Sequence, residues 1–290
     1  MASLVAEKNG QVDPISSCLN IMRRLPPANI EQNLSGLLNL VPSITDELLQ
    51  RVDQPLEIST CGKTKKQFLF SDYNRDGDSY RSPWGNEYHP ALDDGFKPSD
   101  KLRQLEVQAN DIFESYRELY YEGGVSSVYL WDLEEETQEG FAGCFLIKKD
   151  VAGAKHVKQG SWNSIHVVEC NVLPGGKAIY KLTTTIMIAM DTNGKESGVT
   201  NLAGSLTRQS EQTTTVTEEK SHLVNIGHLI EDMENEMRNN MEGLYIQKTK
   251  EIVDNIRNVQ GGPTQGNEHT GKLNAAVLKH GDGRKIDSEI

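Results

Sequence analysis

Long apolar runs are absent from the sequence, and their absence excludes one class of protein. No stretch approaches the ~18 consecutive apolar residues of a membrane-spanning helix. The opening residues, MASLVAEKNG, contain no apolar core of the kind found in secretory signals. We therefore expect a soluble, cytoplasmic protein.

Cysteine and basic charge are also scarce. The four cysteines form no CxxC pair and have no histidine at a metal-ligand spacing: Cys18, Cys61, Cys144 and Cys170. This usage is typical of reduced thiols in a cytosolic protein. The net charge of −12 argues against nucleic acid as the main partner, because binding phosphates requires a basic surface.

Motifs for catalysis and for nucleotide binding are missing as well. No GxGxxG or GxxxxGK[ST] follows a predicted strand, and no GxSxG occurs. The seven histidines are dispersed, and His166, inside a predicted strand, is interpreted as a satisfied structural histidine. Glu134-Glu135-Glu136 is typical of a solvated turn. We expect a protein that is not an enzyme and that has no cofactor and no metal site.

One acidic stretch imitates a calcium-binding loop. Positions 1, 3, 5, 6 and 7 of an EF-hand loop are matched by Asp72, Asn74, Asp76, Gly77 and Asp78. Position 12, which should be a bidentate glutamate, is Pro83. We therefore predict a turn cross-linked by its own side chains, without calcium.

Residues 221–260 are predicted to form one long amphipathic helix. Its apolar stripe has helical spacing: Leu223, Ile226, Ile230, Met233, Met237, Met241, Leu244, Ile252, Ile256 and Val259. The acidic residues, Glu234 among them, are assigned to the opposite face. At ~1.5 Å per residue the helix is roughly 58 Å long. The heptads of a coiled coil break near Lys248, so a sheet is the favoured surface beneath this helix.

Shorter helices are predicted before it. Residues 13–53 contain three apolar stripes separated by Pro26-Pro27 and Pro42, which suggests a small antiparallel bundle. A second amphipathic helix is expected over 99–121, with Ser99 as its N-cap. Its predicted buried stripe is Leu102, Leu105, Ala109, Ile112, Phe113, Tyr116, Leu119 and Tyr120.

Between the two long helices the pattern is that of strands. The five segments are 125–133, 141–148, 162–172, 178–190 and 199–207, and their short connections predict an antiparallel meander. In the segment 178–190 the alternation predicts one core face and one wetter face. Five strands span about 24 Å, so a helix laid across them would overhang unless a second subunit doubled the sheet. A helix running along the strands would weaken this argument.

The predicted fold is an α+β domain whose sheet is completed by a partner subunit. Its parts are an N-terminal helical bundle (1–58), a connector with an amphipathic helix (59–122), the antiparallel sheet (123–208), the long helix packed on the sheet (209–260) and a mobile tail with a short amphipathic segment (261–290).

Several segments resemble the beta subunits of F-actin capping proteins. The most specific is SDYNRDGDSYRSPW (71–84). Others are MRRLPP (22–27), VDQPL (52–56), YYEGGVSSVYLWDL (120–133), SIHVVE (164–169), SLTRQ (205–209) and EDMENEMR (231–238). The resemblance covers roughly residues 13–260. Ser71 departs from it, since the family usually has cysteine there.

The resemblance implies a non-catalytic subunit that pairs with an alpha subunit of the same fold and blocks the barbed ends of actin filaments. Phosphoinositides and regulatory capping-protein-binding proteins are open as further partners. The alternative is a scaffold subunit of the same fold that serves an actin-related filament in a transport complex.

The same resemblance suggests which residues contact actin. Lys149 and Arg238 fall within the matching segments and become candidates, and Lys148 joins them from the same basic hairpin. The lysines are also typical of a protected sheet edge, and Arg238 of a helical ion pair with Glu234 or Glu242. In the tail, Leu273, Val277 and Leu278 form the thin apolar side of a short helix, which the family would dock on actin.

Overall fold

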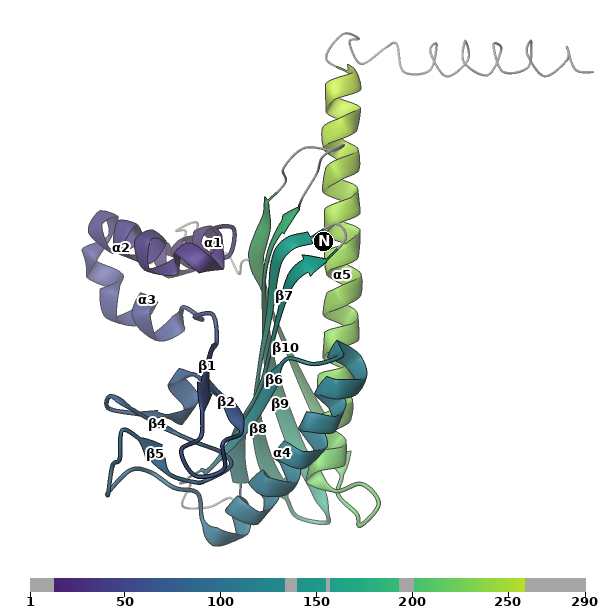
Figure 1. The fold of residues 1–290 in the computed structure, drawn as a ribbon. Coiled ribbons are helices and arrows are strands. Elements are labelled where there is room, and N and C mark those ends of the chain that lie inside the picture. Colours follow the sequence, from purple (N-terminus) through teal and green to yellow (C-terminus); the bar gives the residue numbers. More distant parts are fainter. Residues whose placement is uncertain (1–12, 134–139, 155–156, 193–200, 259–290) are drawn as a thin grey trace, which may run out of the picture. The chain divides into compact units, whose positions relative to one another are not determined.

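The structure is a computed structural model that describes residues 13–133, 140–154, 157–192 and 201–258 (Figure 1). The chain divides into two compact units, Met1–Glu234 and Asn235–Ile290, and the boundary falls inside the last helix.

The first unit begins with the predicted three-helix bundle. The helices are α1 (Pro14–Met22), α2 (Ile30–Leu40) and α3 (Thr45–Arg51), joined by the 3-10 turns η1 (Pro27–Asn29) and η2 (Pro42–Ile44). The carboxylate of Asp13 caps α1 by accepting from the backbone N–H groups of Ile15 and Ser16. A small apolar core holds the helices together: Ile15, Cys18, Leu34, Leu48 and Val52. The prediction for this segment is confirmed.

A hairpin and a tight loop follow the bundle. The hairpin is β1 (Glu57–Thr60) with β2 (Gln67–Phe70), and the loop contains η3 (Asp72–Asn74), β3 (Arg75–Asp76), β4 (Ser79–Arg81) and β5 (Tyr88–His89). Asn74 is buried and donates to the carbonyl oxygens of Leu69 and Arg81, and its Oδ1 accepts from the N–H of Ser71. The calcium-like stretch is therefore a self-linked turn, as predicted.

The central sheet is the predicted five-stranded meander. Its strands are β6 (Val125–Asp132), β7 (Gly140–Ala154), β8 (Val157–Leu173), β9 (Lys177–Thr192) and β10 (Asn201–Thr215), in the order β10-β9-β8-β7-β6 with every pair antiparallel. Four of the five strands are longer than the sequence predicts, because polar residues continue the alternation beyond the apolar segments.

Both faces of the sheet are covered near its middle, which differs from the prediction of one wet face. Met187, on the face expected to be wetter, is buried in a cluster with Leu56, Leu69 and Ile165. Leu56 and Leu69 come from the chain before the sheet, which packs beneath this face. Periodicity within one strand could not reveal a cover supplied by a distant segment.

Helix α4 (Asp100–Tyr121) begins at Ser99, whose side chain accepts from the N–H of Leu102 as predicted. Its buried side contains two polar residues, Glu106 and Asn110, beside Leu102, Ala109 and Phe113. The predicted stripe is wrong at Ile112, Leu119 and Tyr120, which are 57%, 79% and 44% exposed. The helix is rotated so that its polar side chains, and not these three, face the sheet.

The rotation of α4 closes one edge of the sheet. Asn110 Oδ1 accepts from the N–H of Val128 at 2.9 Å, and its Nδ2 donates to the Val128 carbonyl at 2.9 Å. Glu106 Oε2 accepts from the N–H of Leu130 at 2.7 Å and is held by the buried Arg81 guanidinium, also at 2.7 Å. The outward-facing backbone groups of β6 thus have side-chain partners at these residues.

Among the described residues, the opposite edge, β10, has one backbone hydrogen bond outside its own ladder, at Ser205. The N–H of Ser205 points outward and donates to the Arg23 carbonyl at 3.0 Å. Because the β9–β10 ladder continues without a bulge, every second residue after Ser205 also points its backbone N–H and C=O outward. The β6 edge therefore has side-chain partners for its outward backbone groups, whereas the β10 edge presents a regular row of outward N–H and C=O groups.

The long helix, α5 (His222–Asn258), confirms the prediction for residues 221–260. Within the first unit, His222 Nδ1 lies 3.5 Å from the Cys170 sulfur, and Glu234 lies 3.0 Å from His166. Both contacts are to β8, so this part of α5 runs along that strand. The width argument for a doubled sheet, which assumed a helix crossing the strands, therefore loses its premise.

Candidate functional site

A glycine turn places β7 against the end of α4. Glu122 has a left-handed backbone, and Gly123 and Gly124 follow with φ of 114° and 89°. A Cβ atom on Gly124 would lie 2.5 Å from the carbonyl oxygen of Lys148. This close approach requires glycine at position 124.

Lys149 is fixed by this turn. Its Nζ donates to the carbonyl oxygen of Glu122 at 2.8 Å. A cation is favourable here because the helix dipole makes the C-terminus of α4 negative. Since the acceptor is a neutral carbonyl, the contact leaves the positive charge of Lys149 in place. β6 begins opposite Lys148, so from Lys149 onward the outer side of β7 is an edge.

Lys148 lies on the other face of the sheet. Its Nζ donates to Asn163 Oδ1 at 3.3 Å and is 3.5 Å from Asp150 Oδ1, and its side chain is only 14% exposed. Asn163 Oδ1 also accepts from the N–H of Leu56, beneath the sheet. The structure thus separates the two lysines that the sequence analysis treated as a pair.

The remaining candidates lie elsewhere. Arg238 is half-buried on α5, in the second compact unit. Leu273, Val277 and Leu278 lie outside the described residues. The structure therefore does not place these candidates with Lys149, and their roles stay predictions.

A buried polar cluster under α5 was missed in part by the sequence analysis. His166 is fully buried, as a satisfied structural histidine should be, with Nδ1 2.9 Å from Thr184 Oγ1 and Nε2 3.0 Å from Glu234 Oε1. The hydroxyls of Tyr116 and Tyr121 donate to Glu234 at 2.7 and 2.5 Å. Glu234 is 1% exposed, so its assignment to the polar face was wrong.

The charge of Glu234 is stabilised by these contacts. Burial alone would raise the pKa of its carboxyl group, but the hydrogen bond and charge of His166, with the two tyrosine hydroxyls, lower the pKa to about 2. Glu234 is thus a carboxylate at neutral pH. It joins α5 to β8 and to the end of α4.

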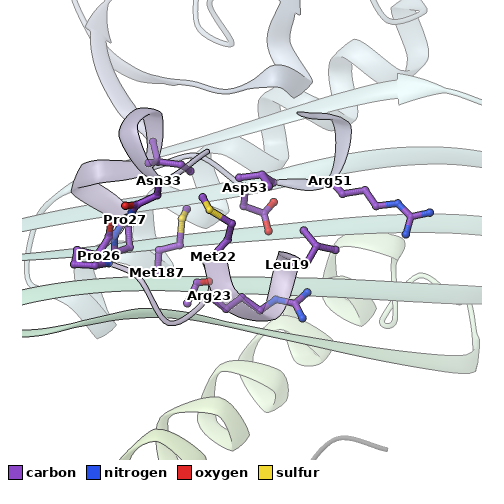
Figure 2. A pocket seen from close by; sticks show the side chains of 12 residues that line it. Leu19, Met22, Arg23, Pro26, Pro27, Asn33, Arg51, Asp53 and Met187 are labelled. Atoms are coloured by element: carbon purple, nitrogen blue, oxygen red, sulfur yellow. Dashed lines mark hydrogen bonds between the residues drawn. The ribbon is translucent and has the colours of Figure 1, made fainter. Parts of the chain in front are cut away.

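A cavity lies between the helical bundle and the lower face of the sheet (Figure 2). Met22, Asp53 and Met187 line it together with Arg23 and Arg51. Burial raises the pKa of the Asp53 carboxyl, although a hydrogen bond from Thr185 and the charge of Arg23 oppose the rise. Its lining combines apolar side chains with the charged groups of Arg23, Arg51 and Asp53.

In the part of the chain that the structure describes, no three or more His, Cys, Asp or Glu side chains gather as a metal site would require. All four cysteines are buried and free, in agreement with the predicted reduced thiols. Among the placed residues, no helix combines the length and the hydropathy of a membrane span.

Comparisons with known proteins decide the family. The model of the family described as F-actin capping protein, beta subunit, matches residues 15–253. The chain belongs to the F-actin capping protein beta subunit family. The F-actin-capping protein subunit beta of Dictyostelium discoideum is 51% identical over 249 residues, which cover 85% of this chain and 90% of that protein. Its counterpart in Drosophila melanogaster is 51% identical over 264 residues, covering 90% and 94%.

A solved structure shows that this beta-family chain shares its fold with an alpha subunit. The homodimeric actin capping protein alpha subunit from Plasmodium berghei matches with a TM-score of 0.51 and 18% identity, over 84% of this chain and 96% of that chain. At this identity the likeness concerns the fold alone.

Proposed function

We propose that this chain is the beta subunit of a heterodimer that caps the barbed ends of actin filaments and blocks both addition and loss of actin subunits. The observation that carries the proposal is the family match over residues 15–253. It is supported by relatives about half identical over nearly their whole length, which are named F-actin-capping protein subunit beta. The function is performed by binding, without catalysis, in the cytoplasm at the actin cytoskeleton.

The sheet edges support pairing with an alpha subunit. The side chains of Glu106 and Asn110 bind the outward backbone groups of β6. Along β10, in contrast, every second residue after Ser205 points its backbone N–H and C=O away from the sheet. An open, regular edge strand favours the addition of a further strand. The fold is shared with an alpha subunit that is itself homodimeric. We propose that the alpha partner continues the sheet at β10.

Contact with actin is proposed for the basic residues first. Lys149 keeps its positive charge at an edge of a chain whose net charge is −12. A cation on a rigid element attracts an acidic filament end before contact and raises the association rate. Arg238 is proposed to act in the same way. Phosphoinositide headgroups and regulatory proteins would compete with actin for the same charges.

The tail is proposed to make a weaker, later contribution. Burying Leu273, Val277 and Leu278 would contribute about 3–5 kcal/mol at ~25 cal/mol per Å². Ordering about eight residues at ~1 kcal/mol each costs about 8 kcal/mol, which is enough to cancel that gain. We expect loss of the tail to raise the dissociation rate, and to weaken capping less than loss of Arg238.

Seeded actin elongation tests the function. The chain is purified with its alpha partner and added to filament seeds, and growth and shortening are followed at each end. We expect both to stop at barbed ends and to continue at pointed ends. Unchanged barbed-end growth at micromolar protein would refute capping. Co-purification with an actin-related filament, without any effect on actin, would instead support the scaffold alternative.

A further inference from the structure

A pocket of about 580 Å³ lies beside the first turns of α4. Its walls come from α4, from the start of β7, from the end of β8 and from the first residue of α5. The apolar part of the lining consists of Leu102, Leu105, Leu133, Phe141 and Val172. Gln104 and Gln108, which are exposed on α4, also line it, so the pocket is open to solvent on that side. Small-molecule sites in proteins typically have volumes of ~300–1,000 Å³ and a mostly apolar lining.

The ends of the strands leave this space unfilled. β7 begins at Gly140, which has no side chain to place in the pocket. Gly140 pairs with Asn171 of β8, so the next residue, Val172, lies beyond the start of β7. Val172 still has a neighbour on β9, Ala178. Val172 and Leu105 are both half-buried, and a bound apolar group would remove more of their surface from water.

The pocket also presents a hydrogen-bond donor from His222. Nδ1 of this histidine lies 2.8 Å from the Tyr180 hydroxyl, which accepts from Asn225 and therefore has its own proton free for Nδ1. Burial and the charge of Lys101 lower the pKa of His222, so at neutral pH the ring is neutral and carries its proton on Nε2. Among the described residues, Nε2 has no hydrogen-bond partner.

Lys101 adds a positive charge to the lining. It is exposed at the start of α4 and forms no ion pair with the described part of the chain. Asp132 also lines the pocket, but its carboxylate accepts from the N–H and from the hydroxyl of Ser99, both at 2.8 Å. The groups that remain for a ligand, on Lys101 and His222, are donors. They favour an acceptor with negative charge.

We infer that this pocket binds a small amphiphilic carboxylate, whose apolar body lies against Leu105, Phe141 and Val172 and whose carboxylate accepts from His222 Nε2 and Lys101. A ligand of roughly ten to fifteen non-hydrogen atoms suits the volume. The apolar body supplies most of the affinity, because a single exposed charge contributes little. The pocket lies at the opposite end of α4 from Lys149, and binding there requires neither Lys149 nor actin.

The test of the charged part uses the native complex that contains this chain, with octanoate as the probe and 1-octanol as its neutral analogue. Isothermal titration calorimetry should give a Kd of about 0.1 mM for octanoate. Lys101→Gln should weaken octanoate binding about fivefold and leave octanol binding within about twofold, because only octanoate loses a charge partner. Lys97→Gln is the matched control, since Lys97 is exposed four residues earlier and does not line the pocket.

A second pair of variants tests the apolar part. Leu105→Trp places a larger side chain in the pocket and should weaken the binding of octanoate and of octanol at least about tenfold. Ile112→Trp adds the same side chain at a position of α4 that is 57% exposed and outside the lining. It should leave both affinities within about twofold. Circular dichroism of each variant verifies that the fold is retained.

Three outcomes would overturn the inference. The first is no binding of octanoate to the native complex at 2 mM, about twentyfold above the expected Kd. The second is an equal effect of the Lys101 and Lys97 changes on octanoate, since the carboxylate would then not lie at Lys101. The third is unchanged binding in Leu105→Trp, because the apolar body would then lie outside this pocket.

Discussion

His166 Nε2 and Glu234 Oε1 lie 3.0 Å apart although the residues are separated by 68 positions, and both side chains are shielded from solvent. Because Glu234 is ionised, the histidine nitrogen that faces it must carry the proton and donate. The other ring nitrogen lies beside Thr184. This pair fixes the position of α5 along β8 in the first unit.

Removing Glu234 should therefore destabilise the fold. Glu234→Ala leaves His166 and the hydroxyls of Tyr116 and Tyr121 without their shared acceptor, which should cost about 3 kcal/mol of unfolding free energy. The measurement is urea unfolding of the complex followed by circular dichroism. Asp232→Ala, at an exposed position of the same helix, is the control and should change stability by less than about 0.5 kcal/mol. Equal effects of the two changes would contradict the role of the pair.

The same carboxylate should make stability depend on acid pH. Its pKa is lowered from 4.5 to about 2 in the folded protein, so its contribution is fully present above pH 4.5 and is lost as the pH falls toward 2. At ~1.4 kcal/mol per unit the loss is about 3 kcal/mol. Urea unfolding at a series of pH values between 6 and 2 would show it. In Glu234→Gln this part of the decline should be absent, and an unchanged pH profile would refute the assignment.

Gly124 should be intolerant of any side chain. Gly124→Ala combines a positive φ with a Cβ atom 2.5 Å from the Lys148 carbonyl, and we expect a loss of about 2–3 kcal/mol. Gly175→Ala is the matched control, because Gly175 has a φ of 83° with nothing within 4 Å of its Cβ position. It should cost about 1 kcal/mol. Equal decreases of the melting temperature in the two variants would show that the close approach to the Lys148 carbonyl adds nothing to the loss of stability.

The two neighbouring lysines should differ in their effect on capping. Lys149→Gln should lower the association rate for barbed ends about threefold and reduce its dependence on salt, because an uncompensated surface charge is lost. Lys148→Gln should change this rate little, since Lys148 is nearly buried and pairs with Asp150. Capping rates at two salt concentrations test the difference. An equal loss in both variants would contradict the proposed role of Lys149.

A proline on the open edge should prevent pairing with the alpha subunit. Gln209 lies four residues after Ser205, so its N–H points outward and is not used within the sheet. Gln209→Pro should leave the chain folded but reduce its co-purification with the alpha partner several-fold. Gln209→Val keeps the N–H and is the control. If the proline variant pairs normally, the partner does not join at β10.

Periodicity predicted every long helix and strand, because each buries an apolar face of regular spacing. Glu106 and Glu234 could not be predicted to be buried, since their partners, Arg81 and His166, are distant in sequence. The rotation of α4 that exposes Ile112 follows from those polar contacts. The opposite orientation of Lys148 and Lys149, in contrast, was predictable from strand alternation alone. Which atoms these two lysines contact could not be predicted from the sequence, because their partners come from other elements of the fold.

The unequal edges of the sheet bear on how many subunits can assemble. A sheet with two open edges can receive a neighbour on each side and extend without limit, as in fibrils. Here α4 has closed β6 through Glu106 and Asn110, and on that side only the short part of β7 after Lys148 is still an edge, so a strand can be added along a whole edge strand only at β10. If the partner's sheet is closed in the same way, assembly ends at two subunits. The stoichiometry of the complex would then be set by two polar side chains that lie far from the interface itself.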